Sequence, residues 1–218
     1  MITTDPKSKP SAMRLYGKGN RRLYINGSER RRFIDVAETQ DLQIRAFCLT
    51  LLYTGCRLSE ARELTQQSLQ AQEQLLSFRS LKKRDQHHIR EMPIPAVLCQ
   101  CLNDLAARAE DTDASAKLER TPQIQDNSSP WLWQSPAGDQ ITRNTAYRWI
   151  KDVMAQAGIL GPQACPKGLR HGFAVHAIFC GIQLNMVQKW MGHADISTTA
   201  IYANAVGREE LELAGRMW

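Results

Sequence analysis

Apolar residues recur at helical spacing along most of the chain, with polar residues between them. This period predicts helices over residues 28–38, 41–54, 57–64, 95–109, 142–158, 166–178 and 182–190. The second of these segments is apolar on nearly every face, which indicates a buried helix that Gly55 ends. Pro166 begins the sixth segment, at a position where a helix tolerates proline.

One stretch departs from the helical pattern. Residues 74–80 and 88–94 read as two strands of a hairpin joined by a basic turn. The fold class is therefore expected to be α+β, mostly helical, with a small antiparallel sheet. Residues 110–130 are polar and are expected to form a flexible loop within the domain. Trp131 and Trp133 alternate in a short apolar element that should pack in the core.

Composition sets broad limits on function. The 218 residues suffice for one large domain or two small ones. The 28 basic and 22 acidic residues give a net charge of +6, which is compatible with DNA binding without being diagnostic of it. No signal peptide or membrane span is evident, so we expect a cytoplasmic protein with six reduced thiols. Cys99 and Cys101 form an isolated Cys-x-Cys motif with no second pair of metal ligands, so no metal is expected.

The last third of the chain carries the candidate chemistry. Lys167, Arg170, His193 and Tyr202 follow one another there, and Arg57 stands in a second motif far upstream. Guanidinium groups suit the negative charge that develops on a phosphodiester under attack. Lys167 and Arg170 are three residues apart, so on a helix they would share a face. Nearby cations should favour the phenolate of Tyr202 and make it a nucleophile.

Arg57 also has a purely structural interpretation. An ion pair with Glu60, at helical spacing, would explain an isolated arginine here. We favour a role for Arg57 in the site because the second motif is present. Glu60 would then orient Arg57 or pack beside it.

Both motifs resemble the catalytic domain of the tyrosine recombinases, also called phage integrases. The first family motif is matched by Thr54, Gly55, Arg57, Glu60 and Leu64. The second is matched by Leu169, Arg170, His171, Phe173, Ala174, His176, Gly181, Val187, Gln188, Gly192, His193, Thr198, Thr199 and Tyr202. The resemblance covers roughly residues 28–204 and is highly specific in order and spacing.

The resemblance implies a role for each site residue. Arg57 and Arg170 would clamp the scissile phosphate, His193 would assist them, and Tyr202 would form a 3′-phosphotyrosyl intermediate without metal or nucleotide. The hairpin turn would supply a lysine as general acid, for which Lys82 fits better than Lys83. His171 and His176 match the pattern too, but structural roles are expected for them.

Lys167 departs from the family pattern, which usually has histidine there. Lysine keeps a proton donor and adds a fixed charge, so we expect activity to survive and Lys167 to assist protonation or charge balance. The same lysine resembles the poxvirus-type topoisomerases. A type IB topoisomerase-like activity is therefore one alternative function, and a DNA-binding regulator that performs no strand exchange is another.

The resemblance also suggests a domain plan. Residues 28–205 would form the catalytic domain, with few residues before it, as in the short family members that lack most of the N-terminal DNA-binding domain. The basic residues 1–27 would be either a DNA-contacting arm or a solvated tail, and residues 206–218 would dock on a neighbouring protomer or on their own domain. The implied partners are double-stranded DNA with specific recombination sites, further copies of this chain in a dimer-to-tetramer synapse, and accessory proteins. The implied location is the bacterial nucleoid in the cytoplasm. The implied genetic context is a mobile element.

Overall fold

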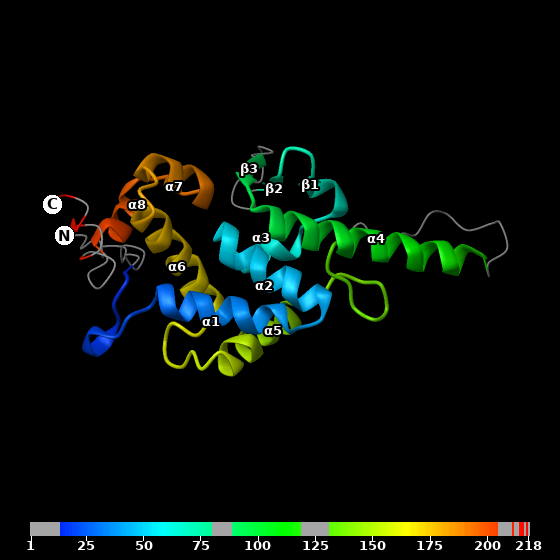
Figure 1. Ribbon diagram of the computed structural model, residues 1–218, viewed down its shortest axis with the longest axis horizontal. Helices are drawn as coiled ribbons and strands as arrows, with labels where there is room; N and C mark the ends of the chain where they lie inside the picture. Colours follow the sequence, from blue (N-terminus) through cyan, green and yellow to red (C-terminus); the bar gives the residue numbers. More distant parts are fainter. Residues whose placement is uncertain are drawn as a thin grey trace, which may run out of the picture.

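The computed structural model describes residues 14–79, 89–118 and 131–204, together with residues 211, 214, 215 and 217; for residues 109–118 it describes the backbone alone. Eight α-helices and three strands lie in these parts of the chain (Figure 1). The helices are α1 (Gly27–Glu38), α2 (Leu42–Thr54), α3 (Leu58–Arg62), α4 (Ala96–Leu118), α5 (Arg143–Gln156), α6 (Pro166–Phe179), α7 (Leu184–Met191) and α8 (Ser197–Ala200). The strands are β1 (Leu69–Gln70), β2 (Leu75–Arg79) and β3 (Ile89–Pro93).

Helix α2 forms the centre of the core. It contacts α1, α4, α5 and α6, and Figure 1 shows these helices arranged around it. Nine of its thirteen residues are buried, as its apolar sequence predicts. The sequence-based prediction of a buried helix ending at Gly55 is therefore confirmed. Trp133 packs fully buried against Phe47 of α2, with ring centroids 5.1 Å apart, so its predicted place in the core is confirmed as well.

The small sheet is antiparallel in the order β1-β2-β3. Strands β2 and β3 form the predicted hairpin, with Leu76 opposite Met92 and Phe78 opposite Arg90. Alternation places Leu76, Phe78 and Met92 in the core. The predicted turn, including Lys82 and Lys83, lies outside the described residues. Strand β1 is only two residues long, too short for a period-2 pattern to predict.

Two segments differ from the expected boundaries. Helix α4 continues to Leu118 and extends away from the body, so the prediction of a loop beginning at residue 110 is wrong for residues 110–118 (Figure 1). Its distal sequence is polar but rich in helix-forming residues, and polar composition alone suggested a loop. In the N-terminal part of the chain, Leu15, Tyr24 and Ile25 are buried, and the Ile25 N–H donates to the Gly168 carbonyl of α6 at 3.2 Å. Part of the proposed arm therefore packs on the core.

Gly55 adopts a left-handed backbone conformation where the core meets the candidate site. Gly55 has φ +59°, and a Cβ atom there would overlap the Phe173 ring of α6. We expect Gly55→Ala to lower the free energy of unfolding by about 2 kcal/mol, because it adds overpacking to backbone strain. Gly158→Ala is the matched control, since Gly158 has φ +64° with open space around it. Urea unfolding should show a loss at least twofold larger for Gly55→Ala; equal losses would contradict the contact with Phe173.

No helix among the described residues is both long and apolar enough to cross a bilayer.

Candidate active site

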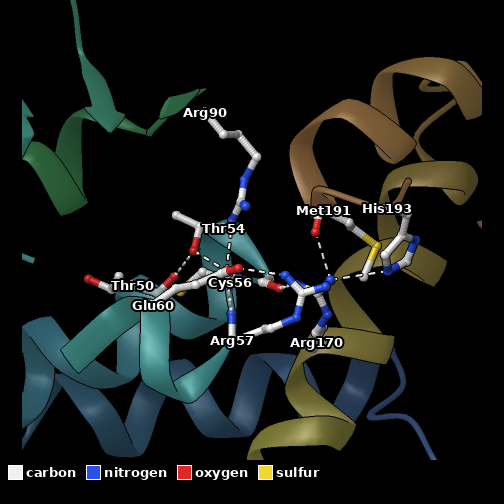
Figure 2. A network of polar contacts seen from close by, with 10 residues as sticks. Thr50, Thr54, Cys56, Arg57, Glu60, Arg90, Arg170, Met191 and His193 are labelled. Atoms are coloured by element: carbon white, nitrogen blue, oxygen red, sulfur yellow. Dashed lines mark hydrogen bonds and ion pairs between the residues drawn. The ribbon is translucent and has the colours of Figure 1, made fainter. Parts of the chain in front are cut away.

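Arg57 stands at the N-terminus of α3 and is held there by Glu60. The Arg57 N–H donates to Glu60 Oε2 at 2.9 Å, and its guanidinium forms an ion pair with Glu60 Oε1 (Figure 2). The Glu60 side chain is 1% exposed, whereas the Arg57 side chain is 28% exposed. The ion pair considered as the structural interpretation of Arg57 is thus present, and it orients the guanidinium while leaving it open to an incoming anion.

Arg170 projects from α6 to the ends of two other helices. Its Nη1 donates to the Gly55 carbonyl at 2.6 Å, and its Nη2 donates to the Met191 carbonyl at 2.7 Å (Figure 2). Arg170 is buried, and this burial, followed by the charge of Arg57, lowers its pKa to about 10. It therefore remains a cation at neutral pH, fixed between the C-terminal ends of α2 and α7.

His193 lies beside Arg170 on the turn after α7. Gly192 ends α7 in the left-handed region and turns the chain so that His193 points inward. His193 Nε2 is 3.1 Å from Arg170 Nη2, and its Nδ1 is 2.9 Å from Thr199 Oγ1. A guanidinium can only donate, so Nε2 accepts and Nδ1 carries the proton of a neutral imidazole. The predicted turn at Gly192 and His193 is confirmed.

Tyr202 is buried rather than presented to solvent. It is 1% exposed, its hydroxyl is 2.9 Å from His171 Nδ1, and its ring stacks on His193 with centroids 6.3 Å apart. Burial raises the pKa of Tyr202 to about 12 and outweighs the opposing charges of Arg170 and Arg57. The expectation that nearby cations would favour the phenolate is therefore wrong for this arrangement, because desolvation has the larger effect.

His171 is the hydrogen-bonding partner of that hydroxyl. Burial, followed by the charges of Lys167 and Arg170, lowers the pKa of His171 to about 4, so its imidazole is neutral at pH 7. Its Nε2 is buried and has no hydrogen-bond partner among the described residues. His171 was expected to have only a structural role, but it contacts the candidate nucleophile directly.

The remaining predicted site residues are Lys167 and Lys82. Lys167 lies in the first turn of α6 and is exposed, near enough for its charge to act on His171 but not buried with Arg170. Lys82, predicted to lie in the hairpin turn, is outside the described residues. The structure thus brings together Arg57, Arg170, His193 and Tyr202, and leaves Lys167 at the rim.

Sequence reasoning missed three contacts within this cluster. His171 meets Tyr202, Thr199 meets His193, and Arg90 of β3 donates to Glu60 at 2.9 Å. The motifs include His171 and Thr199 but do not indicate the partners of these two residues. For Arg90 the available signal was one arginine in a strand whose alternate positions face the core. The cluster places two guanidinium groups and an imidazole beside a tyrosine, an arrangement whose positive charge suits an anion.

Sequence comparison assigns this arrangement to a family. A sequence model of the Phage integrase family matches residues 24–208. The chain is 32% identical over 168 residues to the tyrosine recombinase XerD of Agrobacterium fabrum, covering 76% of this chain and 50% of that protein. It is 27% identical over 196 residues to the tyrosine recombinase XerA of Pyrococcus furiosus, covering 88% of this chain and 60% of that protein. The chain spans between about half and three fifths of the length of these relatives.

Solved structures share the fold. The crystal structure of XerA recombinase superimposes with a TM-score of 0.73 at 25% identity, covering 89% of this chain and 64% of that chain. XerH site-specific recombinase bound to its difH substrate superimposes with a TM-score of 0.68 at 17% identity, covering 93% of this chain and 59% of that chain. The mostly helical fold with its small sheet is therefore that of tyrosine recombinase catalytic domains. Because the family model covers most of the chain, this protein belongs to the phage integrase family.

Proposed function

We propose that this chain cuts and rejoins DNA at specific sites through a covalent bond between Tyr202 and a 3′ phosphate. The observation that supports this most is the convergence of Arg57 and Arg170, from α3 and α6, beside His193 and Tyr202. Two fixed guanidinium groups can donate hydrogen bonds to the non-bridging oxygens of one phosphate.

The bond changes balance without a cofactor. Tyr202 releases its proton to solvent, and its oxygen forms a bond to phosphorus while the bond from phosphorus to the 5′ oxygen breaks. The departing 5′ oxygen takes a proton from Lys82, and Lys167 assists that transfer or balances the charge. A 5′ hydroxyl from another strand then attacks the phosphotyrosine, so the strands rejoin with the bond energy conserved.

The buried tyrosine suggests how cleavage is restrained. In the described arrangement the hydroxyl is bound to His171, and its pKa of about 12 leaves it protonated at neutral pH. Tyr202 must leave this position to reach a phosphate held by the arginines. Assembly of two to four copies on paired DNA sites, with or without accessory proteins, would trigger that movement. Residues 206–218, which lie largely outside the described residues, are a candidate for the coupling segment.

Covalent trapping tests the proposal. The protein is incubated, with a chelator present, with labelled DNA from either side of its own gene and analysed on a denaturing gel beside Tyr202→Phe. We expect an adduct with the native protein and none with the variant, because phenylalanine has no oxygen to bond to phosphorus. An adduct that persists in Tyr202→Phe would refute the assignment of the nucleophile. Specific binding to that DNA without any adduct would favour a DNA-binding regulator, or a recombinase that waits for a partner.

A further inference from the structure

Arg90 is a buried arginine that reaches into the candidate site from the sheet. It is the second residue of β3, and its side chain is 9% exposed. Its Nη2 donates to Glu60 Oε2 at 2.9 Å, while the other oxygen of the same carboxylate is paired with Arg57 (Figure 2). The buried Glu60 carboxylate therefore links Arg57, which is open to substrate, with Arg90, which is not.

The guanidinium of Arg90 is fixed from two further sides. It lies over the Phe78 ring of β2, with the guanidinium carbon 5.0 Å from the ring centroid. It also lies against Gly192, where a Cβ atom would come within 2.7 Å of Arg90 Nη1. The turn that presents His193, the helix whose N-terminus presents Arg57 and the β2–β3 hairpin thus meet at one side chain.

Stability alone does not explain an arginine at this position. Its Nε is buried with no hydrogen-bond partner among the described residues, an arrangement that opposes folding. An apolar side chain could fill space beside Phe78 without this unpaired donor. What the arginine adds is charge. Burial by itself would raise the pKa of Glu60, but the hydrogen bond and charge of Arg90, followed by those of Arg57, lower it to about 2 and keep Glu60 ionised.

We infer that Arg90 is a positioning residue for the proposed cleavage, acting on the scissile phosphate through Glu60 and Arg57. Because its side chain is buried and paired, Arg90 does not itself touch the DNA. It keeps Glu60 ionised and in place, and Glu60 holds the Arg57 guanidinium. Since Arg90 belongs to β3, the same contact ties the position of Arg57 to that of the β2–β3 hairpin. This inference rests on the proposed function.

Cleavage of charged and neutral substrates tests this role. Arg90→Met keeps a similar side-chain length and removes the charge. We expect it to slow single-turnover adduct formation by about 100-fold on the DNA identified by covalent trapping, because a small displacement of a catalytic group has effects of this size. On the same DNA with a methylphosphonate at the scissile position, the slowing should fall below about threefold, since the missing negative charge reduces the need for Arg57.

Matched variants separate positioning from folding. Arg62→Met is the control, because Arg62 is an arginine of α3 that pairs with Gln140 and the Ile141 carbonyl instead of Glu60. We expect it to change neither rate by more than about threefold. In an Arg57→Ala background, Arg90→Met should add no further slowing. Equal slowing on both substrates, or full additivity with Arg57→Ala, would overturn the inference. If Arg90→Met does not fold, Arg90→Gln, which also removes the charge, replaces it under the same criteria.

A second readout needs no cleavage. In ¹⁵N-labelled protein without DNA, the Arg57 Nε–Hε signal, assigned with Arg57→Lys, reports whether the guanidinium is fixed. We expect a sharp, dispersed signal in the native protein and in Arg62→Met, and a signal shifted towards that of a mobile arginine in Arg90→Met. An unchanged signal in Arg90→Met would overturn the inference even if no DNA is cut. A shifted signal without any adduct from the native protein would support the contact while refuting the proposed function.

Discussion

Replacing Arg170 with lysine is expected to slow covalent cleavage by about 1,000-fold while leaving DNA binding within a few-fold of the native value. Arg170 uses two nitrogens to reach the Gly55 and Met191 carbonyls, and this pairing fixes the plane of the guanidinium (Figure 2). Lysine keeps the charge but has one nitrogen, so it cannot hold both carbonyls and fix the cation in one orientation as the guanidinium plane does. The orphaned carbonyl should also lower the free energy of unfolding by about 1–3 kcal/mol.

The measurement for Arg170→Lys is single-turnover adduct formation, with DNA binding followed by gel shift. Arg143→Lys is the matched control, because Arg143 is exposed on α5 and the same change there removes no buried contact. We expect the control to cut at the native rate within about twofold. A rate for Arg170→Lys within tenfold of the native rate would show that a positive charge at this position suffices for cleavage. The fixed plane of the Arg170 guanidinium would then not be required.

His171 is expected to make the protein less stable in acid. Its pKa is about 4 in the folded protein and near 6.5 in an unfolded chain, so between these values only the unfolded chain takes up the proton. The stability that His171 contributes is therefore complete above pH 6.5 and is lost as the pH falls towards 4. The shift corresponds to about 3 kcal/mol. His171→Gln removes the titrating group and should remove this part of the acid sensitivity.

Urea unfolding at about pH 7 and about pH 4.5 measures the His171 effect. The native protein should lose about 2–3 kcal/mol more than His171→Gln over this interval. His176→Gln serves as the control: burial, followed by the charge of Arg30, lowers the pKa of His176 too, but this side chain is only half-buried. Its effect should be clearly smaller. Parallel pH profiles for the native protein and His171→Gln would show that His171 is not buried in its neutral form.

Local patterns predicted much of the fold. The apolar sequence of α2, the glycine that ends it and the alternation in β2 and β3 act over short distances, and the structure confirms each of them. The two motifs likewise identified Arg57, Arg170, His193 and Tyr202, which the fold brings together. The end of α4 was missed because a polar segment of helix-forming residues lacks the apolar stripe that distinguishes a packed helix from a loop.

The parts that could not be predicted depend on tertiary burial. Whether cations lower the pKa of Tyr202 or desolvation raises it depends on how deeply α8 and the following turn place the ring against α6. The contact of Arg90 with Glu60 joins residues 30 positions apart, and strand alternation says nothing about the partner of a side chain. Motif order therefore identifies candidate residues, whereas their protonation and their supporting contacts require the fold.

The most direct test of the account is to identify the residue that becomes bonded to DNA. The trapped adduct is digested with nuclease and trypsin, and the peptide that retains a nucleotide is sequenced by mass spectrometry. Cleavage after Lys189 and Arg208 yields residues 190–208, in which Tyr202 is the only tyrosine. We predict that this peptide carries a nucleotide on Tyr202 through a 3′ phosphate. A nucleotide on any other residue, or one linked through a 5′ phosphate, would contradict the account.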